Sequence, residues 1–399
     1  MIDERRVIFL VGAIQFVNIL DFMIVMPLGP DFARELAIPN AHLGFIGGAY
    51  TAAAAVSGLV GSFFLDRFDR RKAVALAMLG LAIGTLAGAF ATGLATLLAA
   101  RVVAGLFGGP ATSLSLAIVA DVVPPERRGK AFGAVMGAFA AASVLGVPAG
   151  LELARQGGWR LPFIAVASLG VLLTAGAFWW LPPLTLHLAA RHPKTSLRSL
   201  LRRPAVKLSY LMTAVVMAAG FILIPNLSAF LQFNLHYPRA RLGLLYLVGG
   251  AVSFFALRVI GRLVDRFGSF PVGTVGSTAL LVLSWTWFIA TPPWLPVMPI
   301  FVAFMLSMSL RNVPYNTLTS KVPSPAERAR FMSIQSAVQH LASAVGAFLS
   351  ARMLSELPDG ALAGVPRTAM VSIVLTVLVP PMMYLVERQV RMAGSVPTP

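Results

Sequence analysis

Residues 62–68 read Ser-Phe-Phe-Leu-Asp-Arg-Phe, and residues 261–267 read Gly-Arg-Leu-Val-Asp-Arg-Phe. The second segment begins 199 positions after the first (261 minus 62), about half of the 399-residue chain. A second pair of similar segments recurs at nearly the same offset, Pro-Glu-Arg-Arg at 125–128 and Pro-Ala-Glu-Arg at 325–328. Two pairs of similar segments at offsets of about half the chain predict two related halves with the same orientation.

Apolar runs dominate the rest of the sequence. Of all residues, 57% are hydrophobic and only 12% are charged, and the mean hydropathy is +0.81. So little charge cannot cover the surface of a soluble fold, in which about a quarter of residues are charged. A run of about 20 apolar residues can cross a bilayer as a helix. We expect twelve such spans, at residues 7–29, 42–65, 73–93, 95–122, 131–153, 161–181, 208–231, 242–264, 271–291, 295–320, 331–354 and 366–386.

Lysine and arginine predict the topology. If the N-terminus lies inside the cell, 22 of the 32 basic residues fall on inner segments, seven on outer segments and three within spans. Cytoplasmic loops carry such an excess, so we expect an inner-membrane protein with both termini in the cytoplasm. The net charge of +17 then reflects topology, and we expect no nucleic-acid partner. The chain has no cysteine, which excludes disulfides and thiolate metal sites.

The loop after the second span carries a specific motif. Residues 62–72 resemble the Gly-x-x-x-Asp-Arg-x-Gly-Arg-Arg signature of the major facilitator superfamily, with Ser62 and Asp69 in place of its two glycines. The fourth span resembles the Arg-x-x-Gln-Gly-x-Gly pattern of the same family through Arg101 and Gly105. The resemblance covers nearly the whole chain.

The fifth span carries a motif that favours export. Residues 146–150 read Gly-Val-Pro-Ala-Gly and resemble the antiporter motif of drug:proton antiporters and arabinose-efflux-type permeases. The resemblance implies an all-α membrane protein with twelve transmembrane helices in two pseudo-symmetric six-helix bundles. We expect an N-terminal bundle at 1–183, a cytoplasmic basic linker at 184–207 and a C-terminal bundle at 208–399. Parallel repeats of this kind place the solute site between the halves near the membrane midplane.

Asp21 is the only carboxylate that falls deep within an expected span. A charge there costs at least about 2.5 kcal/mol on insertion scales, so deep ionisable residues indicate functional sites. Burial disfavours the charged form, which would let Asp21 take up and release a proton. Asp21 could instead anchor a cationic solute, or form a structural pair with a basic side chain such as Arg101. We expect Asp21→Asn to abolish proton-driven transport and to leave folding intact.

Other polar residues within the spans are further candidates. For proton coupling they are Arg101, by resemblance to the family, and His340, which could change charge near neutral pH. His340 could equally be a hydrogen-bonded residue between helices. The candidates for solute binding are Gln15, Asn18, Tyr50, Thr51, Asn226, Arg311, Asn312, Tyr315, Asn316, Gln335 and Gln339.

The family resemblance also implies a latch of charged loop residues that stabilises the outward-facing state. The gating candidates, in the loops and in the fifth span, are Asp66, Arg67, Arg71, Asp121, Gly146, Pro148, Gly150, Asp265 and Arg266. Positive-inside topology and ordinary membrane packing are the alternative explanations for these arginines and glycines.

Together these features predict a secondary transporter and not an enzyme. We expect proton-coupled efflux of a small amphipathic drug-like or sugar-like solute, by alternating access in a monomer without a cofactor or metal. The expected partners are the solute, protons and the lipid bilayer. No Gly-x-x-x-x-Gly-Lys segment is present, which argues against direct use of ATP. A facilitator or proton symporter of the same fold is one alternative, and a membrane-embedded sensor or enzyme is another.

Overall fold

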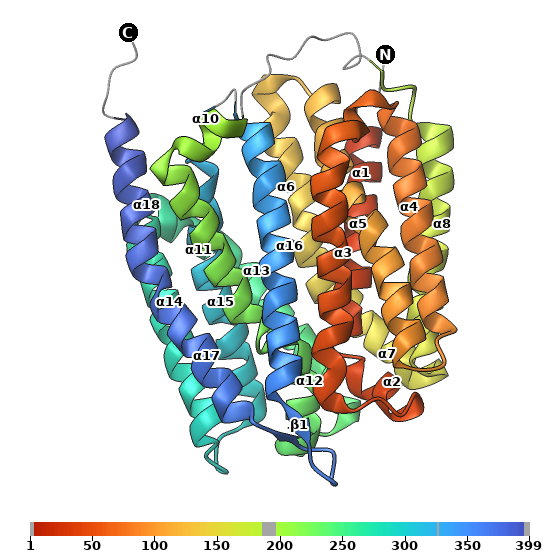
Figure 1. Cartoon of the computed structure of the whole chain (residues 1–399), viewed down its shortest axis with the longest axis vertical. Coiled ribbons are helices and arrows are strands. Elements are labelled where there is room, and N and C mark those ends of the chain that lie inside the picture. The colour runs from red at the N-terminus through yellow and green to blue at the C-terminus, as the bar shows by residue number, and fades with distance from the viewer. Residues whose placement is uncertain (1–3, 186–196, 325–326, 395–399) are drawn as a thin grey trace.

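The computed structural model describes residues 4–185, 197–324 and 327–394, and the chain is helical almost throughout (Figure 1). The elements of the first half are α1 (Glu4–Val25), α2 (Gly29–Glu35), η1 (Asn40–His42), α3 (Leu43–Phe64), η2 (Leu65–Arg67), α4 (Arg70–Ala89), α5 (Leu94–Val122), α6 (Pro125–Ala141), η3 (Ala142–Gly146), α7 (Val147–Gly157) and α8 (Arg160–Trp180).

The elements of the second half are α10 (Leu197–Arg202), α11 (Pro204–Phe221), η4 (Ile224–Asn226), α12 (Leu227–Ala229), η5 (Phe230–Asn234), η6 (Arg239–Arg241), α13 (Leu242–Phe267), α14 (Ser269–Trp285), η7 (Thr286–Ala290), α15 (Val297–Ser320), α16 (Arg328–Met353), β1 (Ser355–Glu356), β2 (Leu362–Ala363), α17 (Val365–Val377) and α18 (Val379–Gly394). The strands β1 and β2 pair antiparallel in one short hairpin between α16 and α17.

Twelve helical segments follow the expected spans in chain order. Eleven segments of the described chain are long and apolar enough to cross a membrane. The twelfth is α16, whose 26 residues include the polar side chains of Gln335, Gln339 and His340. Large apolar side chains such as Leu172 and Phe255 are exposed on the outer faces of the helices, where lipid would cover them.

The predicted fold of two six-helix bundles is confirmed. Within the first half α4 packs on α5 and α8, and within the second α14 packs on α15 and α11 on α16. Helices α3 and α16 join the halves on one side, and η3 with α7 contacts α13 on the other. The domain boundaries stay a prediction; α10 falls in the expected linker, and residues 186–196 lie outside the described residues.

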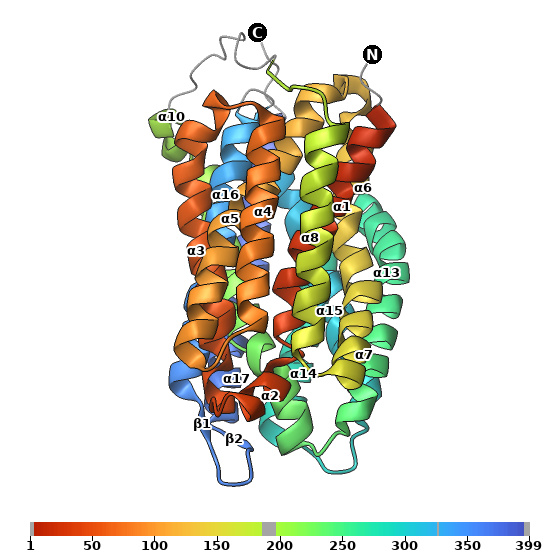
Figure 2. The ribbon, with the colours of Figure 1, turned by 90° about the vertical axis from the view of Figure 1, so that its right-hand side faces the viewer.

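The two ends of the molecule differ in their elements. Helix α1 begins and α18 ends at one end, which we call the terminal end. Helix α2 and the β1–β2 hairpin lie at the opposite end, which we call the hairpin end (Figures 1 and 2).

The halves pack most closely at the hairpin end. A Cβ built on Gly44 of α3 would lie 2.3 Å from the carbonyl oxygen of Ala347 of α16. Gly58 lies about four turns further along roughly the same face of α3, and a Cβ there would meet nothing within 4 Å. On α13, a Cβ on Gly250 would lie 3.1 Å from a backbone oxygen of η3, whereas one on Gly261 would meet nothing. Both contacts between the halves therefore loosen toward the terminal end.

Polar contacts also join the halves at the hairpin end. Arg239 Nε of η6 donates to Asp31 Oδ1 of α2 at 2.7 Å. The backbone N–H and the side-chain amide of Asn40 both donate to the carboxylate of Glu356 in β1. The ion pairs that the structure describes at the terminal end each lie within one half, namely Glu4–Arg127, Asp69–Arg71, Arg70–Asp121, Arg203–Glu327 and Glu387–Arg391.

Candidate functional site

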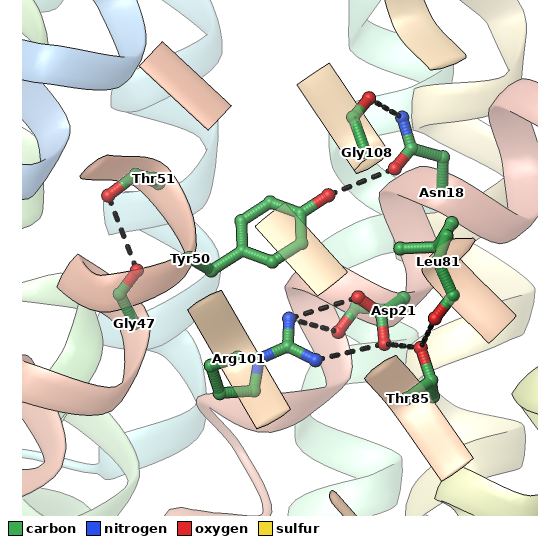
Figure 3. Close-up of polar contacts among 9 residues, drawn as sticks. All are labelled: Asn18, Asp21, Gly47, Tyr50, Thr51, Leu81, Thr85, Arg101 and Gly108. Carbon is green, nitrogen blue, oxygen red and sulfur yellow. Dashed lines mark hydrogen bonds and ion pairs between the residues drawn. The ribbon is translucent and has the colours of Figure 1, made fainter. Parts of the chain in front are cut away.

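Asp21 and Arg101 form a buried ion pair in the first half (Figure 3). Arg101 Nη1 donates to Asp21 Oδ1 at 3.0 Å, and Nη2 donates to Oδ2 at 2.9 Å. Each residue is only 1% exposed. Two parallel charge-assisted bonds of this kind are among the strongest hydrogen bonds in proteins. Asp21 lies about 26 Å along α1 from its start, so the pair is buried toward the hairpin end.

Thr85 of α4 completes the surroundings of the carboxylate. Its Oγ1 lies 2.7 Å from Asp21 Oδ1 and 2.8 Å from the carbonyl oxygen of Leu81. A threonine hydroxyl has one hydrogen to donate and two lone pairs that accept. Thr85 can therefore donate to ionised Asp21, or accept from protonated Asp21 while it donates to Leu81. This contact suits both protonation states of Asp21.

Tyr50 of α3 covers one face of Arg101. The guanidinium carbon lies 4.7 Å from the centre of the tyrosine ring, a cation–π distance. The Tyr50 hydroxyl donates to Asn18 Oδ1 at 2.9 Å (Figure 3). Asn18 Nδ2 in turn lies 3.0 Å from the carbonyl oxygen of Gly108 and 2.7 Å from Thr112 Oγ1. The network therefore connects α1, α3, α4 and α5 around one buried pair.

Two glycines of α5 make room for Tyr50. A Cβ on Gly105 would lie 2.2 Å from the carbonyl oxygen of Tyr50, and one on Gly108 would lie 2.2 Å from its hydroxyl oxygen. Real Cβ atoms do not approach other atoms so closely. Any larger residue at either position would therefore displace Tyr50 from Arg101.

The antiporter-like motif of the fifth span packs against residues of α1 that come just before and just after Asp21. A Cβ on Gly146 would lie 2.7 Å from the side chain of Leu20, and one on Gly150 would lie 2.4 Å from that of Ile24. Pro148 lies in the first turn of α7, directly after the π-helix η3. The helix is continuous here, with the Val147 N–H bonded to the carbonyl of Ala142 across the wide turn of η3. Pro148 has no N–H to continue this pattern.

Helices α11, α15 and α16 hold a second polar cluster, which we call the glutamine cluster: Thr213, Tyr315, Gln335 and Gln339. Gln335 Nε2 donates to Thr213 Oγ1 at 2.6 Å and to the Tyr315 hydroxyl at 3.0 Å. Gln339 Nε2 donates to the same hydroxyl at 3.3 Å. The buried Oε1 of Gln335 has no hydrogen-bond partner among the described residues. The cluster contains no charge, so it suits neutral hydrogen-bonding groups.

Arg311 lies one turn before Tyr315 on α15 and is 2% exposed. Its Nε donates to Asn312 Oδ1 at 3.2 Å. A Cβ built on Gly220 of α11 would lie 3.8 Å from its Nη2. Asn316, one turn after Asn312, is exposed. Arg311 therefore belongs to the same region as the glutamine cluster, and Asn316 faces outward.

The other predicted residues are distributed over both halves. Gln15 is buried, and its Oε1 has no partner in the described chain. In the part of the chain that the structure describes, the Thr51 hydroxyl bonds to carbonyl groups of its own helix. Asn226 Nδ2 donates to Ser350 Oγ at 2.9 Å, and His340 is half-buried on α16. The structure thus groups Asn18 and Tyr50 with Asp21, and it leaves Thr51 and Asn226 in separate local contacts.

The motif loop caps α4. Asp69 Oδ1 accepts from the backbone N–H groups of Arg71 and Leu184, at 2.9 and 3.0 Å. Aspartate is a favoured residue at this capping position, which accounts for an acid where the family signature has glycine. Arg70 Nε lies 3.1 Å from Asp121 Oδ2 at the end of α5. Asp121 is therefore paired with the α4 side of the loop.

The remaining gating candidates lie at helix ends. The side chain of Asp66 lies outside the described residues, and Arg67 is exposed. Asp265 and Arg266 are both exposed in the last turn of α13, where Arg266 lies 5.2 Å from the centre of the Phe267 ring.

Sequence reasoning missed several residues of the two polar clusters. Thr85, Thr112 and Thr213 all bond to the predicted residues. The available signal was a single hydroxyl within an apolar run, as in the Gly-Thr-Leu segment at 84–86. Gly108 gave no signal, because only its contact with Tyr50 shows why a side chain is excluded.

The chemistry of the two centres differs. The first half holds a titratable acid and base in direct contact, and the second holds neutral amides and hydroxyls beside a buried cation. Within the described residues, no group of three or more His, Asp or Glu side chains could hold a metal ion.

Comparison with known proteins agrees with this architecture. The family model described as Major Facilitator Superfamily matches residues 11–347. The chain is 28% identical over 344 residues to the chloramphenicol resistance protein of Streptomyces lividans, covering 82% of this chain and 83% of that protein. It is also 28% identical over 353 residues to the purine ribonucleoside efflux pump NepI of Escherichia coli O6:H1, covering 85% and 84%.

Solved structures show the same fold. The D-xylose-proton symporter has a TM-score of 0.76 at 16% identity, covering 95% of this chain and 97% of that one. A bacterial homolog to the human lysosomal transporter Spinster has a TM-score of 0.72 at 18% identity, covering 99% of both chains. Members of the matched family are transporters and not enzymes. The match covers most of the sequence, and this multi-pass membrane transporter therefore belongs to the Major Facilitator Superfamily.

Proposed function

We propose that the chain is a proton-coupled exporter of a small amphipathic drug-like or sugar-like solute, and that Asp21 carries the proton. The observation that carries the proposal is the buried pair of Asp21 and Arg101, in which each charge is 1% exposed. Within the spans of this chain, no other carboxylate lies so deep. Intramembrane ionisable residues of this kind typically mark proton relays or substrate pathways.

The pair couples protonation to conformation through its energetics. A proton on Asp21 removes the counter-charge of Arg101, and a buried charge left alone costs about 3–5 kcal/mol. That cost is relieved only if water, solute or another group reaches Arg101. Proton uptake is therefore favourable in a state in which α1 and α5 have separated enough to admit one of these. The Thr85 hydroxyl can accept the hydrogen bond of protonated Asp21, so the unfavourable free energy arises from the unpaired charge of Arg101.

Alternating access would proceed by rocking of the halves. Their packing loosens toward the terminal end on both α3 and α13. If the chain lies in the inner membrane with both termini in the cytoplasm, the looser terminal end faces the cytoplasm. The conformation described would then receive solute from inside the cell. Opening outward would require separation of Asp31 from Arg239 and of Asn40 from Glu356. The boundaries 1–183, 184–207 and 208–399 and the monomeric state are part of the same proposal.

The charged gating candidates lie at the terminal end of the helices, where the halves would close when the hairpin end opens. We assign the latch to the pair of Arg70 and Asp121 and to the cap that Asp69 provides for α4. Gly146 and Gly150 permit α1 to slide along η3 and α7 because they lack side chains at the contact. Arg67, Arg71, Asp265 and Arg266, together with Asp66 and Pro148, complete the proposed set.

Two relatives suggest solutes to test, because their names refer to chloramphenicol resistance and to efflux of purine ribonucleosides. Both kinds of molecule carry hydroxyl and N–H groups on an apolar or aromatic frame. The glutamine cluster offers amide and hydroxyl partners for such groups. We include Gln15 and Asn226 as further candidates for the walls of the solute path, and His340 as a further candidate for proton coupling.

The test is transport in proteoliposomes with an imposed proton gradient, using chloramphenicol, inosine and adenosine. An acidic lumen should drive solute uptake into vesicles that hold the chain with its cytoplasmic side outward. Asp21→Asn should abolish this uptake. Because that variant can fold poorly, the neutral pair Asp21→Asn/Arg101→Gln is the second variant. Equal gradient-driven uptake by the double variant would refute the assignment of the proton to Asp21.

The alternative function is a facilitator or proton symporter. It is favoured if Asp21 and Arg101 stay paired throughout the cycle as a structural contact, since their geometry is also that of a stable ion pair. Solute equilibration without a response to the gradient would then indicate a facilitator. Uptake driven by a gradient of the opposite sign would indicate a symporter.

A further inference from the structure

Arg311 is a buried cation without a counter-charge. It is 2% exposed, and the hydrogen bond described for it runs to the neutral amide oxygen of its neighbour Asn312. None of the ion pairs in the described part of the chain includes it. It lies about 14 Å from the terminal end of α15, well inside a hydrocarbon core about 30 Å thick.

The positions of the Asp and Glu residues indicate that the chain itself does not neutralise Arg311. Of the 15 Asp and Glu residues, Asp3 lies outside the described residues. All the others except Asp21 lie outside the spans or within about two turns of the end of one. Asp21 already makes two bonds to Arg101. Among the described residues well inside the spans, two arginines and one carboxylate are therefore buried, namely Arg101, Arg311 and Asp21. Protonation of Asp21 would increase this excess of positive charge.

Glycines of two neighbouring helices lie against Arg311. A Cβ on Gly276 of α14 would lie 2.5 Å from the backbone nitrogen of Arg311, so α14 packs directly on this turn. Gly220 of α11 lies beside Nη2 and presents no side chain to it, because a Cβ there would be 3.8 Å away. One turn further along α15, Tyr315 belongs to the glutamine cluster, where the buried Gln335 Oε1 also has no partner among the described residues.

We propose that Arg311 binds an oxyanion, carried either by the solute as a carboxylate or as a free inorganic ion. A guanidinium presents parallel N–H groups that match such an anion, and burial without a partner is costly unless a ligand supplies the missing charge. The unpaired Gln335 Oε1 accepts a hydrogen bond from a hydroxyl or N–H group of the same ligand. That the bound anion is part of a transported solute rests on the proposed function. The binding of the anion to Arg311 is independent of proton coupling.

The test is thermal unfolding of the purified, detergent-solubilised full chain with matched probes at constant ionic strength. Benzoate, naphthalene-2-carboxylate and indole-3-acetate are compared with their neutral amides, and inorganic phosphate is a separate arm. We expect at least one anion to raise Tm while the matched amide does not. Binding should weaken at least about ten-fold in Arg311→Gln, the loss of a hydrogen bond to a charged group, and should be partly kept in Arg311→Lys.

Arg258→Gln is the matched control, because Arg258 is an arginine of a spanning helix whose side chain is exposed. It should leave anion binding unchanged. Stabilisation by the aromatic carboxylates alone identifies the solute as the source of the anion, and stabilisation by phosphate identifies a free ion; both support the proposal.

A second measurement needs no ligand. Without ligand, Arg311→Gln should unfold at the same or a higher temperature than the unmodified chain, because it removes an uncompensated charge. Arg101→Gln should unfold at a lower temperature, because it leaves Asp21 alone. The proposal is overturned if no anion stabilises the chain, if Arg311→Gln binds anions equally well, or if it is as destabilised as Arg101→Gln. Loss of proton coupling in Asp21 variants would not affect any of these readouts.

Discussion

The ion pair of Asp21 and Arg101 predicts a strongly non-additive double-mutant cycle. Asp21→Asn leaves the guanidinium of Arg101 buried without a counter-charge, and Arg101→Gln leaves the carboxylate in the same position. Each single change should cost about 3–5 kcal/mol of the free energy of unfolding. The double variant leaves two neutral side chains that can still hydrogen-bond, so it should cost about 2 kcal/mol or less. The expected coupling energy is about 4 kcal/mol or more.

The assay is reversible unfolding by sodium dodecyl sulfate in mixed micelles, followed by tryptophan fluorescence. A control cycle uses Glu35→Gln and Arg160→Gln, whose side chains form an ion pair at 2.6 Å but are 49% and 44% exposed. Exposed pairs contribute about 0–1 kcal/mol, so this cycle should be nearly additive. If the two cycles gave equal coupling energies, or if each deep single variant cost less than about 1 kcal/mol, the buried pair would not have the role given to it here.

Three further variants test separate contacts. Thr85→Val should lower gradient-driven transport about ten-fold or more, since it removes a hydrogen bond to a charged group, and Thr85→Ser should retain most of it; equal rates for both would contradict the role of the hydroxyl. Gly108→Ala should destabilise the chain by about 1–3 kcal/mol through overpacking against Tyr50, measured by the same unfolding assay, whereas Gly58→Ala should not. The Ser324 hydroxyl and the Arg203 guanidinium hold the pKa of Glu327 below its ordinary value of 4.5. Because the folded-state value is the lower one, the stabilisation is present above pH 4.5 and is lost as pH falls through the folded value, so the stability difference from Glu327→Gln should vanish in acid and persist at pH 7.

Most of the fold could be predicted from the sequence because its signals are local. A run of apolar residues defines a span whatever its neighbours are, and the repeated segments at 62–68 and 261–267 define the two halves. The helical breaks were less visible. The π-helix η3 interrupts the fifth span just before Pro148, and no residue pattern at 142–146 indicates it.

The candidate site was predictable only in its charges. Asp21 and Arg101 are conspicuous because charge is costly in a membrane, but their direct contact depends on how α1 and α5 pack. Thr85 and Gly108 are ordinary residues in sequence, and only their contacts with Asp21 and Tyr50 give them a role. From the sequence we expect Asp21→Asn to leave folding intact. Because Asp21 contacts Arg101, this substitution should also lower the free energy of unfolding.

The most direct test of the central claim measures proton movement driven by solute in proteoliposomes with a pH-sensitive dye in the lumen and no initial proton gradient. Inward movement of a transported solute should drive protons out, so the lumen should become alkaline. In the Asp21→Asn/Arg101→Gln variant, labelled solute should still exchange across the membrane while luminal pH stays constant. Unchanged alkalinisation by that variant, or acidification by the unmodified chain, would contradict proton antiport through Asp21.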